Sequence, residues 1–162
     1  LYERARDGDA EAVRAIESEY RDAAFRAETD VFGDDHDLPY LWTQYARVGV
    51  IYDGMIEMYR HAGLPVDTAF KRSIVLAIVG AQIWLDDVDD YGADIEDGQL
   101  TPVTAEYLLA TDDSDAARRV RELTRQYLDR ARADATDSES PLTGIATEYI
   151  YWSGDPHVLP GY

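Results

Sequence analysis

The sequence predicts an all-α fold, a single-domain helical bundle of about five to six helices over residues 1–162. Three observations favour this fold. Apolar residues recur at spacings of three and four along most of the chain, which is the period of an amphipathic helix. No stretch alternates polar and apolar residues between hairpin turns, and no repeat of 20 to 50 residues is present. A chain of 162 residues without cysteine is also long enough to bury one core without disulfides.

The first two helices are delimited by capping and breaking residues. An amphipathic pattern over 3–29 predicts the first helix, and Gly33 falls in the polar break that follows it. Asp37 is a candidate N-cap for a second helix over about 38–62. Gly63, followed by a proline two residues later, is the expected stop of that helix.

The third helix is expected from Val66 to about Gly92. Its surface is apolar on almost all sides, which predicts the central helix of the bundle. Because the turn before it is only about three residues long, the second and third helices should lie antiparallel and side by side. Residues 92–100 are rich in Gly and Asp and are expected to form a loop, and Thr101-Pro102 then predicts the start of a short fourth helix.

The last third of the chain predicts two more helices. Polar breaks at 111–115 and 134–140 delimit an arginine-rich fifth helix, and a sixth is expected to close at Gly154. The tail 155–162 is expected to be irregular. Its apolar side chains could dock on a partner or on the bundle itself, and the sequence leaves both alternatives open.

Acidic side chains dominate the composition, with 33 Asp and Glu against 15 Lys and Arg and a net charge of −18. Lys71 is the only lysine, and the chain resembles halophilic archaeal proteins in this respect. Such a charge disfavours nucleic acid and anionic membranes as partners. At molar salt, where the Debye length is about 3 Å, the self-repulsion is screened, so we expect a protein that loosens at low salt.

Neither a membrane span nor a secretory signal is predicted. The longest strongly apolar stretch, Ile74 to Leu85, is shorter than the roughly 20 residues that a membrane helix needs. The first residues show no signal-peptide pattern, which favours a cytoplasmic location. Residues upstream of Leu1 could nevertheless contribute to a site.

An aspartate motif at the end of the third helix is the main candidate for a functional site. Asp86, Asp87 and Asp90 form the pattern D-D-x-x-D, and helical spacing brings their carboxylates together at the negative end of the helix dipole. A hard cation such as Mg²⁺ would offset that repulsion and could capture a diphosphate. Antiparallel packing should bring a second acidic group to the same end. The candidate metal ligands are therefore Asp86, Asp87, Asp90, Asp34, Asp35 and Asp37.

Other patterns leave alternatives open. Aspartate is so abundant that D-D-x-x-D arises readily by chance, and the acids could serve surface hydration alone. The arginines of the fifth helix fit pairing with neighbouring acids, or a phosphate clamp. Tyr45, Tyr52 and Tyr59 recur every seven residues, which fits a core, a subunit contact or a prenyl pocket. The three histidines lack the spacing of a zinc site.

The segment from Ala81 to Asp90 resembles the second aspartate-rich motif of class I polyprenyl diphosphate synthases, in which a buried helix with a Gln leads into D-D-x-x-D. The stretch 94–102 is similar to the residues that follow that motif, although Gln99 stands where the family has a lysine. The resemblance implies an isoprenoid-synthase-like bundle in which the three aspartates of the motif hold Mg²⁺ facing a diphosphate.

Two functional hypotheses follow from these patterns. The first is a divergent isoprenoid-synthase-like protein that binds Mg²⁺ and a diphosphate ligand. The second is a non-catalytic halophilic bundle that acts through a protein partner or by self-association, for example as a homodimer.

Overall fold

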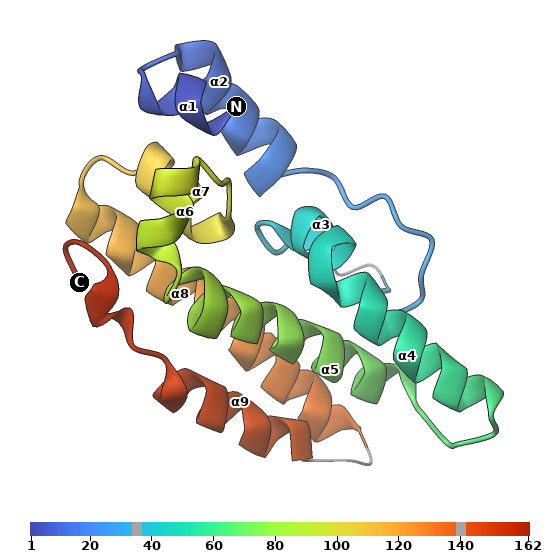
Figure 1. Ribbon diagram of the computed structural model, residues 1–162. Helices are drawn as coiled ribbons and strands as arrows, with labels where there is room; N and C mark the ends of the chain where they lie inside the picture. The colour runs from blue at the N-terminus through green and yellow to red at the C-terminus, as the bar shows by residue number, and fades with distance from the viewer. Residues whose placement is uncertain (34–36, 139–141) are drawn as a thin grey trace.

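The computed structural model describes residues 1–33, 37–138 and 142–162, and all regular elements in these ranges are helices (Figure 1). In chain order they are α1 (Tyr2–Arg6), α2 (Ala10–Ala15), η1 (Ile16–Arg21), α3 (Leu41–Gln44), η2 (Tyr45–Gly49), α4 (Val50–His61), α5 (Thr68–Ala81), η3 (Gln82–Asp87), α6 (Tyr91–Asp97), α7 (Pro102–Leu109), α8 (Asp113–Asp137), α9 (Leu142–Ser153) and η4 (Pro156–Val158). The all-α prediction is confirmed, and the chain is divided into more segments than the five or six expected.

The helices α5 and α8 pack against each other along the middle of the molecule, with α9 beside them and α4 on the other side of α5 (Figure 1). Gly80 permits the close approach of α5 and α8, because a Cβ at this position would lie 2.8 Å from Cδ2 of Leu128. The sequence prediction that the third helix is central is therefore confirmed. A single hydrophobic cluster extends from Ala5 to Leu159.

The combined helix α5–η3, Thr68–Asp87, is long and apolar enough to cross a membrane by length and composition. Half of its most apolar window is buried inside the protein. Since core helices meet the same criteria, its packing against α8 is sufficient to explain its composition.

The first predicted helix, 3–29, is wrong in extent. Gly8 adopts a φ of 90° and ends α1, and the Asp9 side chain then caps α2 by accepting from two backbone N–H groups. Helical structure stops at Arg21. From Asp22 to Gly33 the chain is irregular, and the half-buried Phe25 packs edge to face against Phe32 of the core, with ring centroids 5.1 Å apart. Tertiary burial of these rings outweighs the local helical pattern.

The second helix begins at Leu41 rather than Leu38, so Asp37 is not its N-cap. Tyr40 precedes the helix with a φ of 62°, a left-handed conformation that is unusual for an aromatic residue. Its side chain is buried and its hydroxyl donates to Oε1 of Glu106 at 2.7 Å, which holds the residue in this conformation. The stop at Gly63 is as predicted, with a φ of 87°.

The expectation that residues 92–100 form a loop is wrong over most of its length, because α6 occupies Tyr91–Asp97. Tyr91 is buried, and its ring lies 4.6 Å from that of Tyr107 in α7. Packing on α7 therefore stabilises a helix that the local Gly and Asp content disfavours. The predicted start of the next helix is correct: Thr101 forms a capping box with Thr104, with proline at the first helical position.

The C-terminal tail is irregular apart from the 3₁₀ turn η4, and it docks on the bundle itself. Leu159 is buried in the core, and the Tyr107 hydroxyl donates to the carbonyl of Pro160 at 2.7 Å. Gly161 passes so close to the start of α8 that a Cβ would lie 2.5 Å from the backbone carbon of Asp113. This contact decides between the two alternatives that the sequence leaves open for the tail.

Candidate functional site

Within residues 1–33, 37–138 and 142–162, three segments wind as π-helices: η1, η2 and η3. Their wider turn shows in backbone bonds that span five residues, from the N–H of Asp22 to the carbonyl of Glu17 at 2.9 Å and from Val88 to Ile83 at 3.1 Å. π-helical turns are rare, and they occur frequently at functional sites because an extra residue redirects the side chains. The region where these three segments approach one another is therefore the candidate functional site.

Each π-helical segment contributes one polar side chain to the same region: Tyr20, Arg47 and Asp87. Nη1 of Arg47 lies 2.8 Å from Oδ1 of Asp87. Tyr20 lies near enough to this pair to feel its charges: burial raises the pKa of the Tyr20 hydroxyl, and the negative charge of Asp87 raises it further. A charged contact thus joins the first turns of the second predicted helix, in η2, to the last turn of the third, in η3. Antiparallel packing of these two helices predicts this meeting of their ends.

Asp87 is the most unusual residue of the group. It is only 1% exposed, and its Oδ2 atom has no hydrogen-bond partner among the residues that the structure describes. Burial raises the pKa of Asp87 to about 6; Arg47 opposes the rise, while Asp86 and Asp94 add to it. A single half-exposed guanidinium therefore supplies too little positive charge for this carboxylate.

Two further carboxylates stand on the following turns. The backbone N–H of Asp90 donates to the carbonyl of Asp86, and the N–H of Asp94 donates to the carbonyl of Asp90. Asp90 therefore lies one turn from Asp86 on one side and one turn from Asp94 on the other. Asp94 is 8% exposed, and burial followed by the charge of Asp90 raises its pKa. Asp86 accepts a hydrogen bond from Gln82. We call Asp86, Asp87, Asp90 and Asp94 the acidic cluster.

Asp94 is not among the ligands predicted from the sequence, because residues 92–100 were expected to form a loop. The spacing of four from Asp90 was the available signal, and it has meaning only if α6 is recognised as a helix. Gln44 was also missed. Its carboxamide is fully buried, and neither Nε2 nor Oε1 has a hydrogen-bond partner within the described ranges. Gln44 lies near Tyr20 and offsets a small part of the rise in the Tyr20 pKa that burial causes.

The second predicted acidic group does not join the cluster in the described part of the chain. Asp34 and Asp35 lie outside the described residues. Asp37 is exposed, and its carboxylate lies 3.8 Å from Nη2 of Arg130 on α8. Over 1–33, 37–138 and 142–162, no group of three or more His, Asp or Glu side chains is arranged to hold a metal ion. In this arrangement Arg47 is the cation that Asp87 contacts.

A second charged group surrounds Lys71 on the side of α5 that faces α4. The Nζ atom of Lys71 lies 2.6 Å from a carboxylate oxygen of Asp53, 2.9 Å from one of Glu57 and 3.0 Å from one of Asp30. Burial alone would lower the pKa of Lys71, but the hydrogen bonds to these carboxylates outweigh burial and raise it. The ammonium group stays charged and fully bonded, so this lysine serves as a structural counter-ion rather than a nucleophile, although a cavity of about 380 Å³ lies beside it.

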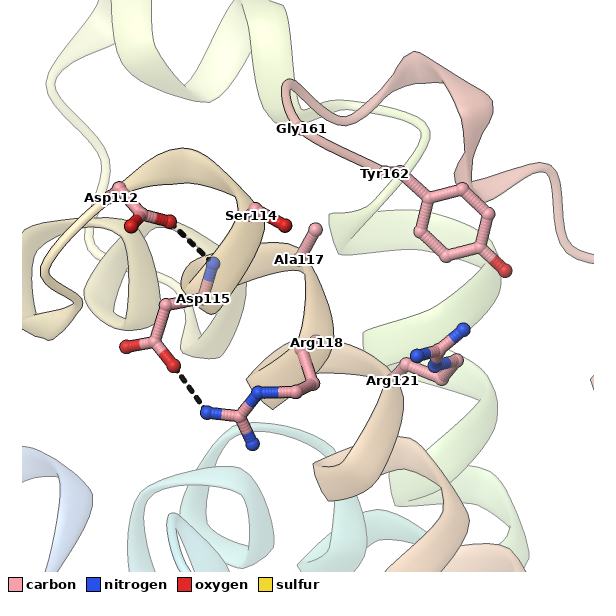
Figure 2. A pocket seen from close by; sticks show the side chains of 8 residues that line it. All are labelled: Asp112, Ser114, Asp115, Ala117, Arg118, Arg121, Gly161 and Tyr162. Atoms are coloured by element: carbon pink, nitrogen blue, oxygen red, sulfur yellow. Dashed lines mark hydrogen bonds and ion pairs between the residues drawn. The ribbon is translucent and has the colours of Figure 1, made fainter.

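A cavity of about 430 Å³ lies between the tail and the first turns of α8 (Figure 2). Arg118 reaches towards it but is bonded to Asp115 and Glu122. The Arg121 guanidinium lies 5.7 Å from the ring centroid of Tyr162. For Arg118, the structure therefore agrees with pairing to neighbouring acids and not with a phosphate clamp.

Comparison of the chain with protein-family models, with curated proteins and with solved structures gave no match. The geometry and electrostatics of the acidic cluster and its neighbours are therefore the basis for proposing a function.

Proposed function

We propose that the acidic cluster binds a divalent cation, Mg²⁺, and through it the diphosphate group of a small ligand, in an isoprenoid-synthase-like bundle. One observation carries the proposal. Asp87 is buried where η2 and η3 meet, with one carboxylate oxygen on Arg47 and further carboxylates beside it, and its other oxygen has no hydrogen-bond partner in the described part of the chain.

The donor set suits a hard cation. Mg²⁺ prefers oxygen ligands and commonly takes one or two carboxylates while keeping several waters, so it does not need a complete cage of protein atoms. Asp87 offers an oxygen that accepts no hydrogen bond from any described residue, and Asp86 and Asp90 are exposed and able to turn. We expect these three residues to hold the ion and Asp94 to add negative charge behind them.

The cation would supply the positive charge that lets an acidic surface accept a diphosphate. Without it, a protein with a net charge of −18 repels phosphates. Arg47 is the nearest protein group able to share this role, because its side chain is 41% exposed and a guanidinium can bind phosphate oxygens with two parallel hydrogen bonds. Residues from η2 and η3 would then contact one ligand.

Calorimetric titration tests the proposal directly. Mg²⁺ and then a prenyl diphosphate are added in 2 M KCl to the wild type and to the double variant Asp87→Ala with Asp90→Ala. Asp89→Ala is the matched control, because Asp89 is exposed on the same turn but outside the acidic cluster. We expect heat in the wild type and the control, and none in the double variant. No heat in the wild type, or equal heat in all three, would refute the proposal.

The role of the second predicted acidic group is tested in the same way. Asp37→Ala should leave Mg²⁺ binding unchanged if Asp37 serves only Arg130, and should weaken it if Asp37 joins the site when the ion is present.

A further inference from the structure

The amphipathic pattern of α4 is inverted. Its acids Asp53 and Glu57 face Lys71 on the inner side of the helix, where Asp53 is 6% exposed. The solvent side of α4 is apolar. Its large side chains are between 42% and 65% exposed: Val50, Ile51, Met55, Met58 and Tyr59. We call these residues, together with the exposed Gly54 among them, the outer α4 face.

None of these six residues is Asp, Glu, Lys, Arg or His, although 30% of the chain's residues are charged, and the exposed His61 at the end of α4 lies 4.0 Å from Glu57. Both acids of α4 are neutralised from within, Asp53 by Lys71 and Glu57 by Lys71 and Arg60. A helix that turns its charges inward and its large apolar side chains outward exposes the side that is most costly to hydrate. Such a face is stable when another apolar surface covers it.

We propose that this surface is the outer α4 face of a second copy of the chain, with the two α4 helices antiparallel across a two-fold axis. A two-fold interface places the same patch of both copies in contact, so the patch must suit itself. Two copies that each carry a charge of −18 repel most strongly where acids are unpaired. The outer α4 face avoids this repulsion, whereas an anionic membrane would repel a protein with this net charge.

The area of the face is sufficient for a weak to moderate dimer. Its five large side chains are each roughly half exposed, so they can bury on the order of 500 Å² per copy and about 1,000 Å² in total, at the lower limit of specific interfaces. The two methionines are flexible and adapt their shape to a facing copy.

Gly54 lies near the middle of the face, and nothing lies within 4 Å of a Cβ built on it. Helices in contact have axes about 8–10 Å apart, and Cα atoms lie about 2.3 Å from each axis. The two Gly54 Cα atoms would therefore be roughly 3.4–5.4 Å apart at the crossing point, and the upper part of this range suits a disulfide. Disulfides bridge Cα atoms about 4.4–6.8 Å apart, so cysteines at this position should form a bond between copies.

Cysteine cross-linking tests the geometry, because the chain has no cysteine of its own. Gly54→Cys is compared with Gly92→Cys, a matched control at another exposed helical glycine with nothing within 4 Å of an added Cβ. Mild oxidation should convert the first variant to a linked dimer, twice 18.2 kDa, and leave the second as single chains. Equal rates of cross-linking for the two variants would overturn the proposal.

Sedimentation in 2 M KCl without Mg²⁺ provides the second readout, which is independent of cation binding. The wild type should sediment as a dimer, and Ile51→Glu should sediment as a monomer with an unchanged helical spectrum, because Ile51 is 56% exposed and its replacement disturbs no core contact. Ile145→Glu introduces the same charge at a site on α9 that is 69% exposed and should leave the dimer intact. The proposal would be refuted if the wild type sediments as a monomer, or if Ile145→Glu dissociates the dimer and Ile51→Glu does not.

Discussion

Replacement of Asp87 by Asn should make the protein more stable at neutral pH in the absence of Mg²⁺. In the folded protein the pKa of Asp87 is raised from 3.8 to about 6, because burial and neighbouring acids disfavour its charge more than Arg47 favours it. The folded state therefore holds this proton more tightly than the unfolded chain. The stability that this group contributes is complete below about pH 4 and is lost as the pH rises through 6.

The size of the effect follows from the same values. One pKa unit corresponds to about 1.36 kcal/mol, so a rise from 3.8 to about 6 corresponds to roughly 3 kcal/mol between pH 4 and 7. Asn cannot ionise and does not follow this change. As the pH rises from 4 to 7, the unfolding free energy of the variant should therefore increase by up to about 3 kcal/mol relative to that of the wild type. The loss of the charged contact with Arg47 lowers the net gain at pH 7.

Urea unfolding followed by circular dichroism, in 2 M KCl with a chelator, measures this difference at several pH values. Asp89→Asn is the control, since Asp89 is exposed and should show no such pH dependence relative to the wild type. Addition of Mg²⁺ should then stabilise the wild type and not Asp87→Asn. A difference between wild type and variant that stays constant from pH 4 to 7, or that changes in the opposite direction, would refute the reasoning about Asp87.

Three further results are expected. Lys71→Met should lower the unfolding free energy by about 3 kcal/mol and the melting temperature by roughly 6–12 °C; the value lies at the lower end for a broken buried ion pair because Asp53 is buried while Glu57 and Asp30 can rehydrate. Thr101→Ala should cost about 1 kcal/mol in chemical denaturation, because it removes the cap of α7. The melting temperature of the wild type should rise between 0.1 M and 3 M KCl as self-repulsion is screened, and a flat or falling curve would contradict the halophilic interpretation.

Local signals predicted much of the helical framework. The apolar period and the caps placed the helices that became α5–η3, α7, α8 and α9 close to their observed bounds. Gly63 and Thr101-Pro102 marked boundaries correctly, because a left-handed stop and an N-cap depend on the residue and its immediate neighbours. These features need no knowledge of the rest of the chain.

Errors occurred where distant contacts outweigh local preference. Phe32 is buried and Phe25 is half-buried in a stretch of irregular chain with a helical sequence pattern, and Tyr91 stabilises α6 through its contact with α7 in a segment with a loop-like sequence. Gly154 was expected only as a helix stop. In the structure a Cβ at this position would lie 2.2 Å from Nε1 of Trp84, so the glycine also permits close packing against η3.

The sequence alone determined that the chain is helical and acidic, and that Asp86, Asp87 and Asp90 stand at the end of a buried helix, because composition and helical spacing are local properties. Only the tertiary structure decided that Asp87 is buried against Arg47, forty residues away in the chain, with Asp94 beside it. It also decided that α4 turns its acids towards Lys71. The cost of burying a charge depends on which groups surround it in space, and that information is absent from the order of residues until the helices pack.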